Sequence, residues 1–150
     1  MDCCGQCQPT FPQTKELLSY LFCLKIASLF LVLVGLSKIF ISDYNGLLND
    51  FIVLVVIVVI VLCLDYYMSA LLIFLYIFNI FHSMIFVGLR IQNTSLKITD
   101  KFTSHKFLLI GGLIIQSISI VFYILMTVLT FYIYKEIRFC KLKAEGDYRK

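Results

Sequence analysis

The sequence predicts an all-α, polytopic integral membrane protein, an antiparallel bundle of four transmembrane helices with a tight hairpin between helices two and three. Of its 150 residues 61% are hydrophobic and only 15% are charged, whereas a soluble domain averages about 45–50% apolar and about 25% charged residues. A soluble domain of this size buries only about two-thirds of its unfolded surface. The composition therefore excludes a soluble enzyme, a disordered tail and a nucleic-acid-binding module.

The apolar residues fall into segments that give the number of spans. A spanning helix needs about 20 residues to cross a hydrocarbon core of about 30 Å, and the apolar block Phe51–Leu89 would form a helix of roughly 58 Å. We expect this block to break at Asp65-Tyr66-Tyr67, because tyrosines favour the membrane interface. A three-span chain with one long, tilted or bent helix is the alternative. The predicted spans are residues 17–41, 47–67, 68–89 and 107–134.

Loop charges predict the orientation. With four spans, the tails 1–16 and 135–150 share a side with the Asp65 hairpin, and that side holds seven basic residues against five on the other. We therefore expect both tails to be cytosolic. We expect no cleavable signal peptide, so the first span acts as its own insertion signal.

Cysteines near the predicted cytosolic interface suggest lipidation. Cys3, Cys4 and Cys7 lie in the N-terminal tail, and Cys140 follows the last apolar segment. Myristoylation is excluded because Asp2 follows the initiator methionine, and a zinc site would lack a fourth nearby ligand. S-acylation requires only thiols held near the membrane, so we predict palmitoylation. Unmodified thiols, or a metal or redox role, are the alternatives.

Asn93 begins the sequon Asn93-Thr94-Ser95 in the predicted loop 90–106. Only a luminal loop would be glycosylated there, so this sequon agrees with cytosolic tails and an endomembrane location.

Two lysines interrupt the first span. We expect Lys25 and Lys38 to extend outward to the interface along their apolar stems. The alternative is a buried pair between Lys25 and Asp65. Asp43 and Asp50 flank a turn-like Asn-Gly pair and are expected in a solvated loop.

A polar seam is predicted between the third and fourth spans. Asn79, His82 and Ser83 share one helix face, as do Gln116 and Ser119. We expect the two faces to meet through interhelical hydrogen bonds worth about 0.6–2 kcal/mol each. A proton or substrate path through Asn79 and His82 is the alternative, since histidine titrates near neutral pH.

No metalloprotease, nucleophile-elbow or phosphate-loop motif is present in the sequence. We therefore predict a non-enzymatic protein with no catalytic residue, cofactor or metal. Its expected partners are the lipid bilayer and other membrane proteins, or further copies of itself as an oligomer, and not nucleic acid.

The layout of short cytosolic tails and a tight central hairpin resembles that of small four-span proteins of Golgi and vesicle membranes. No motif matches residue by residue, so no site residue follows from the likeness. The predicted function is vesicle trafficking or membrane organisation through helix–helix contacts, in the Golgi or another endomembrane. One alternative is an accessory structural subunit of a larger complex, such as a respiratory-chain or ATP synthase assembly of the mitochondrial inner membrane. A second alternative is a small transporter or channel-forming oligomer.

Overall fold

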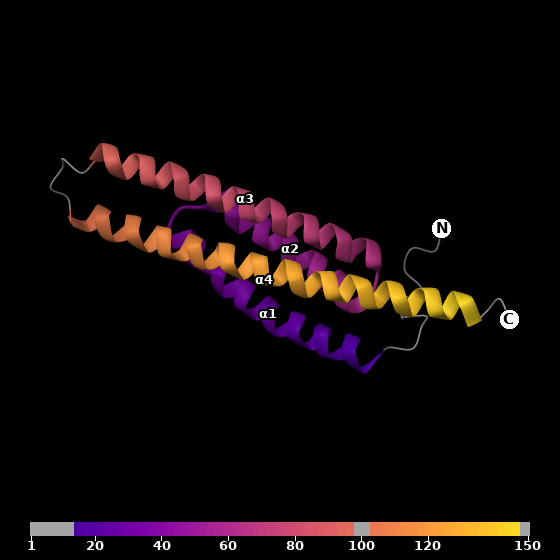
Figure 1. Cartoon of the computed structure of the whole chain (residues 1–150). Coiled ribbons are helices and arrows are strands. Elements are labelled where there is room, and N and C mark those ends of the chain that lie inside the picture. The colour runs from indigo at the N-terminus through magenta and orange to yellow at the C-terminus, as the bar shows by residue number, and fades with distance from the viewer. Residues whose placement is uncertain (1–13, 98–102, 148–150) are drawn as a thin grey trace, which may run out of the picture.

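A computed structural model describes residues 14–97 and 103–147, and the side chains of residues 14–92 and 110–143. The described residues form four α-helices and no strand (Figure 1). The helices are α1 (Lys15–Phe40), α2 (Tyr44–Cys63), α3 (Tyr66–Lys97) and α4 (Thr103–Asp147).

Each helix contains a segment long and apolar enough to cross a membrane. In α3 this segment is Tyr66–Gln92, and in α4 it is Ile110–Lys143. The predicted fold class is therefore confirmed as an all-helical, membrane-embedded four-helix bundle. Because α2 and α3 are separate helices, the three-span alternative is wrong.

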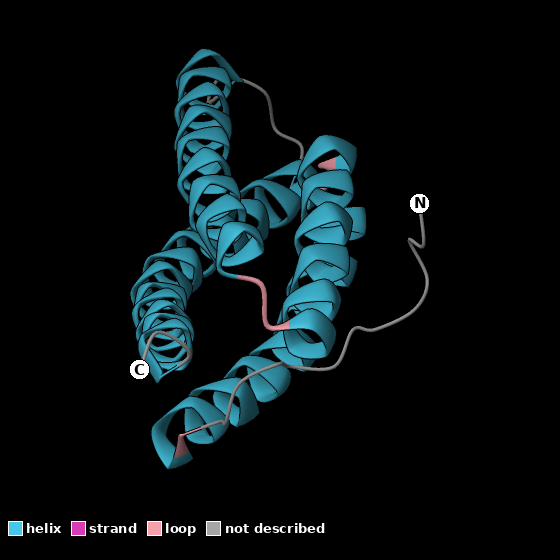
Figure 2. Ribbon diagram, turned by 90° about the vertical axis from the view of Figure 1, so that its right-hand side faces the viewer, coloured by secondary structure: helices cyan, strands magenta, loops and turns pink. Residues whose placement is uncertain are grey.

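The helices pack in a closed ring. α1 contacts α2 and α4, and α3 contacts the same two helices, with the most extensive packing between α3 and α4. The start of α1, the α2–α3 turn and the end of α4 lie at one end of the bundle, which we call the hairpin end (Figure 1). The α1–α2 turn lies toward the opposite end, which we call the loop end. Figure 2 shows how short the described connections between the helices are.

Alternating steps of three and four residues separate the buried positions of α3 and α4. This spacing is the one that lets the side chains of neighbouring helices interlock in a left-handed bundle. In α3 the pattern comprises Ser69, Leu72, Tyr76, Asn79 and Ser83. In α4 it comprises Gln116, Ser119, Tyr123, Met126, Thr130, Ile133, Ile137 and Cys140.

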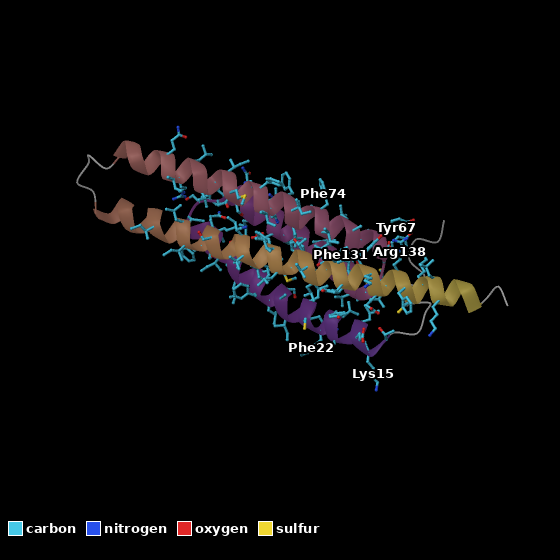
Figure 3. All side chains as sticks on the ribbon, in the orientation of Figure 1. Lys15, Phe22, Tyr67, Phe74, Phe131 and Arg138 are labelled. Atoms are coloured by element: carbon cyan, nitrogen blue, oxygen red, sulfur yellow. The ribbon has the colours of Figure 1, made fainter. Side chains whose placement is uncertain are left out.

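Large apolar side chains cover the outer surface of the spans. Phe22 on α1 and Phe74 on α3 are 64% and 65% exposed and point away from the bundle (Figure 3). Such side chains need no protein partner in a bilayer, because lipid tails are as apolar as the side chains themselves.

The α2–α3 turn, Leu64-Asp65, overlaps the predicted break at Asp65-Tyr66-Tyr67 and begins one residue before it. α2 ends at Cys63, and Leu64 adopts the left-handed conformation with φ of 48°. Leucine tolerates this backbone because its side chain is buried and its N–H donates to the Ile60 carbonyl at 2.9 Å. Asp65 then caps α3 by accepting from the Tyr67 N–H at 2.9 Å. A cap, rather than a pair of interfacial tyrosines, sets the boundary.

α4 is longer than the predicted span 107–134. It has 45 residues, or roughly 67 Å of helix, so it exceeds the hydrocarbon thickness. Lys, Glu, Arg, Leu and Ala dominate its last turns and are good helix formers. Much of the predicted tail 135–150 is therefore helical.

Candidate functional site

A lysine and an aspartate form an ion pair inside the bundle. Lys38 lies in the last turn of α1 and Asp50 in the second turn of α2, and their side chains approach across the short α1–α2 turn. The ammonium Nζ of Lys38 is 2.8 Å from Asp50 Oδ2. The two residues are only 1% and 3% exposed. Charges this deeply buried are tolerated when they are paired and hydrogen-bonded.

Tyr123 of α4 completes a triangle with this pair. Lys38 donates to the Tyr123 hydroxyl oxygen at 2.7 Å, and that hydroxyl donates to Asp50 Oδ1. Lys38 Nζ also lies 3.5 Å from the Gly46 carbonyl oxygen. The ammonium therefore has Asp50 as its ion-pair partner, and Tyr123 and Gly46 as its hydrogen-bond acceptors.

Tyr76 brings the fourth helix to the same place. Its ring is buried, with its centroid 6.1 Å from that of Tyr123. We call Lys38, Asp50, Tyr76 and Tyr123 the charge cluster. Each helix of the bundle supplies one member, so the cluster fixes all four helices relative to one another.

The α1–α2 turn is bonded to α3 and α4 beside the charge cluster. Asp43 caps α2 by accepting from the Gly46 N–H at 2.9 Å, and its other oxygen accepts from Gln116 Nε2 at 2.6 Å. The guanidinium of Arg90 donates to the Ile41 carbonyl. These contacts join the first helical hairpin to the second.

Gly46 is required by this arrangement. A Cβ atom there would lie 2.2 Å from Asp43 Oδ2 and 2.7 Å from Asp43 Cγ. Any side chain at this position would displace the carboxylate that caps α2 and binds Gln116.

The residues of the predicted polar seam lie between α3 and α4, but the expected hydrogen bonds across it are not formed: Gln116 Nε2 donates to Asp43, and Asn79 Nδ2 and Ser83 Oγ have no partner among the described residues. Ring contacts of Tyr66 with Tyr134 and of Tyr76 with Tyr123 show that residues of the two helices lie opposite each other when their numbers sum to about 200. This register places Ser83 opposite Gln116 and Asn79 near Ser119. These four residues are buried. His82 is half-buried and lies to the side, one residue from the buried stripe of α3.

Several buried polar atoms have no hydrogen-bond partner among the described residues. Ser119 donates to the Ile115 carbonyl at 2.8 Å and is satisfied within its own helix. Asp50 Oδ2 is held by the ion pair with Lys38 alone, and the other atoms without a hydrogen-bond partner are Tyr76 Oη, Asn79 Nδ2, Ser83 Oγ, Gln116 Oε1 and Thr130 Oγ1.

The Lys25–Asp65 pair, given above as the alternative to an outward-pointing Lys25, is not formed. Lys25 is exposed and Asp65 caps α3. The expected outward path of Lys38 and the expected solvation of Asp43 and Asp50 are wrong, because all three are buried. A signal was present in the sequence: Lys38 and Asp50 are equally distant from residue 44, so a tight turn there places them side by side.

The predicted acylation and glycosylation sites differ in where the structure places them. Cys3, Cys4 and Cys7 lie outside the described residues. Cys140 is 5% exposed, within the buried stripe of α4, so its thiol is not presented for acylation as expected. Residue 93 lies within α3 rather than in a loop, and its side chain is outside the described part.

A cleft of about 170 Å³ lies between α1 and α2. Apart from Asp50 its lining is apolar or glycine, and the Asp50 carboxylate bonds to Lys38 and Tyr123. Within the described residues no group of three His, Cys, Asp or Glu side chains is placed to hold a metal.

Comparisons with protein-family models, with curated proteins and with solved structures give no match.

Proposed function

We propose that the protein is a non-enzymatic, multi-pass component of endomembranes that acts in vesicle trafficking or membrane organisation through contacts of its outer helix faces. The observation that carries this proposal is that the Lys38 ammonium finds its partners inside the bundle: it is ion-paired with Asp50 and donates to Tyr123 and Gly46. A bundle that uses its buried charges to fix its own helices offers its outer faces to partners.

The outer face of α3 is the best candidate for such a contact. Phe74, Phe78 and Phe81 follow one another at spacings of four and three residues and are all exposed. We call them the aromatic face. Aromatic side chains are enriched at protein interfaces and among the residues that dominate binding energy. They also anchor a contact at low cost in conformational entropy.

Two sequence features support an endomembrane, with the Golgi as the favoured location. The excess of basic residues on the side of the tails supports cytosolic termini, and the sequon at Asn93 then lies on the luminal side. Acylation of Cys3, Cys4 and Cys7 belongs to the same proposal, because cytosolic thiols near a membrane are the ones acylated.

Site-specific photo-crosslinking in intact membranes tests the proposal. A photoreactive phenylalanine analogue replaces Phe78 in one variant and Phe22, on α1, in the other. We expect discrete protein adducts from position 78, lost when Phe74 and Phe81 are both changed to leucine, and fewer adducts from position 22. Equal adduct patterns at both positions would contradict a role for the aromatic face. One stoichiometric partner would instead favour the accessory-subunit alternative.

A small transporter is the second candidate, and the unpartnered polar atoms on α3 favour it. In that case Asn79→Leu or His82→Ala would abolish flux in reconstituted vesicles while the amount of folded protein stays unchanged. For a purely structural seam, any change in flux would follow the amount of folded protein.

A further inference from the structure

One stripe of α3 and one of α4 carry more hydrogen-bonding groups than the two helices satisfy. Tyr76, Asn79 and Ser83 are at least nine-tenths buried on the interior side of α3, and each has a polar atom without a partner among the described residues. On α4, Gln116 is fully buried, and its Oε1 is also without a partner. Buried polar atoms of folded proteins nearly always have a partner, either in the protein or in ordered water.

We propose that this α3–α4 seam binds water inside the membrane-spanning bundle, as a short file of internal water molecules that ends at the charge cluster. The site goes beyond the proposed function, because it concerns the interior of the bundle rather than its outer faces.

The arrangement of the groups supports a file of water molecules. From Tyr76 to Ser83 there are seven residues, which correspond to about 10 Å along the helix. Asn79 lies between them on the same stripe, and the register of α3 and α4 places Gln116 opposite Ser83. Tyr76 at the other end packs against Tyr123, which bonds to both Lys38 and Asp50. The seam is therefore continuous with the buried ion pair.

The chemistry of the atoms selects water over other small ligands. Asn79 Nδ2 is a donor, Gln116 Oε1 is an acceptor, and the hydroxyls of Tyr76 and Ser83 do both. Internal water typically makes about three hydrogen bonds to such a mixed set. A cation is disfavoured because the seam residues include no carboxylate: Asp50 is paired with Lys38 at 2.8 Å, and the two oxygens of Asp43 already accept from Gly46 and Gln116. An apolar ligand would leave every one of these atoms unsatisfied.

Water-edited solid-state NMR on the full-length protein in lipid nanodiscs tests the proposal. We expect magnetisation to pass from water to the side-chain amides of Asn79 and Gln116. Met126 and Ile133, buried on the same face of α4 but away from the seam, serve as controls within the wild-type protein. Transfer to Asn79 and Gln116 that is no stronger than transfer to these two residues would overturn the proposal without any variant.

A pair of serine variants gives a second, independent readout. In Ser83→Ala we expect reduced transfer to Gln116 and a thermal midpoint no higher than that of the wild type, because the water file loses one of its partners. A dry seam predicts the opposite, since removing an unsatisfied buried hydroxyl should raise the midpoint. Ser117→Ala is the matched control, because Ser117 is exposed on α4 and donates to its own helix at 2.8 Å. A raised midpoint in Ser83→Ala alone would overturn the proposal.

Discussion

The two ends of the bundle bury similar helix stripes but fill them with different chemistry. Toward the loop end the interior contains an ion pair, a carboxylate–amide bond and two tyrosines. Toward the hairpin end it is mainly hydrocarbon, and the buried polar side chains there are the small hydroxyls of Ser69 and Thr130. The buried side chains there include Leu17, Leu21, Leu24, Ile57, Ile60, Leu72, Ile133 and Ile137.

This difference shows that the two halves of a membrane bundle can have different roles: one half is stabilised by close packing, and the polar contacts of the other half determine how the helices are oriented. In a bilayer an apolar side chain gains little by leaving lipid for protein, so the hairpin half is stabilised by close packing. The groups of the loop half cannot exchange their partners for lipid, because unsatisfied polar groups are costly in hydrocarbon. The loop half therefore selects one register and one rotation for each helix.

Two glycines, Gly35 and Gly46, lie in the loop half of the bundle, beside Asp50 and Asp43. At Gly35 a Cβ would make ordinary contacts with Leu47 and Asp50 at 3.5–3.6 Å, so this position of α1 has room for an alanine beside α2. Gly46 makes room for the Asp43 carboxylate. In the hairpin half, bulky aliphatic side chains set the helix separation instead.

The largest expected effect comes from breaking the ion pair. Asp50→Leu leaves the Lys38 ammonium buried without its counterion, so we expect a loss of about 3–5 kcal/mol in the free energy of unfolding. Steric trapping in bicelles measures this quantity. The double variant Lys38→Met/Asp50→Leu should recover most of the loss, because it removes both charges. The control is Lys25→Met, which changes an exposed lysine. If Asp50→Leu were as stable as this control, the ion pair would not stabilise the loop end of the bundle.

Gly46→Ala tests the space around the Asp43 cap. The added Cβ overlaps the Asp43 carboxylate, and we expect a loss of about 1–3 kcal/mol, as is typical of overpacked sites. The same unfolding measurement applies. Gly88→Ala on α3 is the control, because a Cβ at residue 88 meets nothing within 4 Å. That control should be neutral or stabilising by up to about 1 kcal/mol, from helix propensity.

Gln116→Leu removes the donor to Asp43 across the two hairpins. We expect a loss of about 1 kcal/mol, in line with interhelical hydrogen bonds in membranes. A double-mutant cycle with Asp43→Ala, which removes the acceptor, isolates the coupling between the two side chains. Additive effects would show that the 2.6 Å contact does not stabilise the bundle.

The smallest effect is expected in the hairpin half. Ile60→Val removes one methyl group from a fully buried site, and we expect a loss of about 0.5 kcal/mol, at the low end of the range for such changes. Thermal unfolding in detergent, compared with Asp50→Leu, measures the contrast between the two halves. If Ile60→Val lowered the stability as much as Asp50→Leu does, the two halves would not differ in how strongly they depend on single side chains.

The sequence by itself determined the number of helices, the position of the central turn to within a few residues, and the inward direction of Asn79, Ser83, Gln116 and Ser119. These features follow from local patterns, since an apolar segment of about 20 residues must form a spanning helix in lipid. Polar residues spaced three or four apart share a face whatever that face contacts.

Only the tertiary structure decided which charged residues are buried in the bundle and which are exposed. A lysine near the end of a span can extend to the interface or pair inside the bundle, and the sequence of α1 is compatible with both for Lys25 and for Lys38. The choice depends on which side of α1 is covered by α2 and α4, a rotation that no local pattern encodes. With Lys38 turned inward, the short turn places Asp50 beside it, Tyr123 of α4 completes the triangle, and Lys25 remains outside.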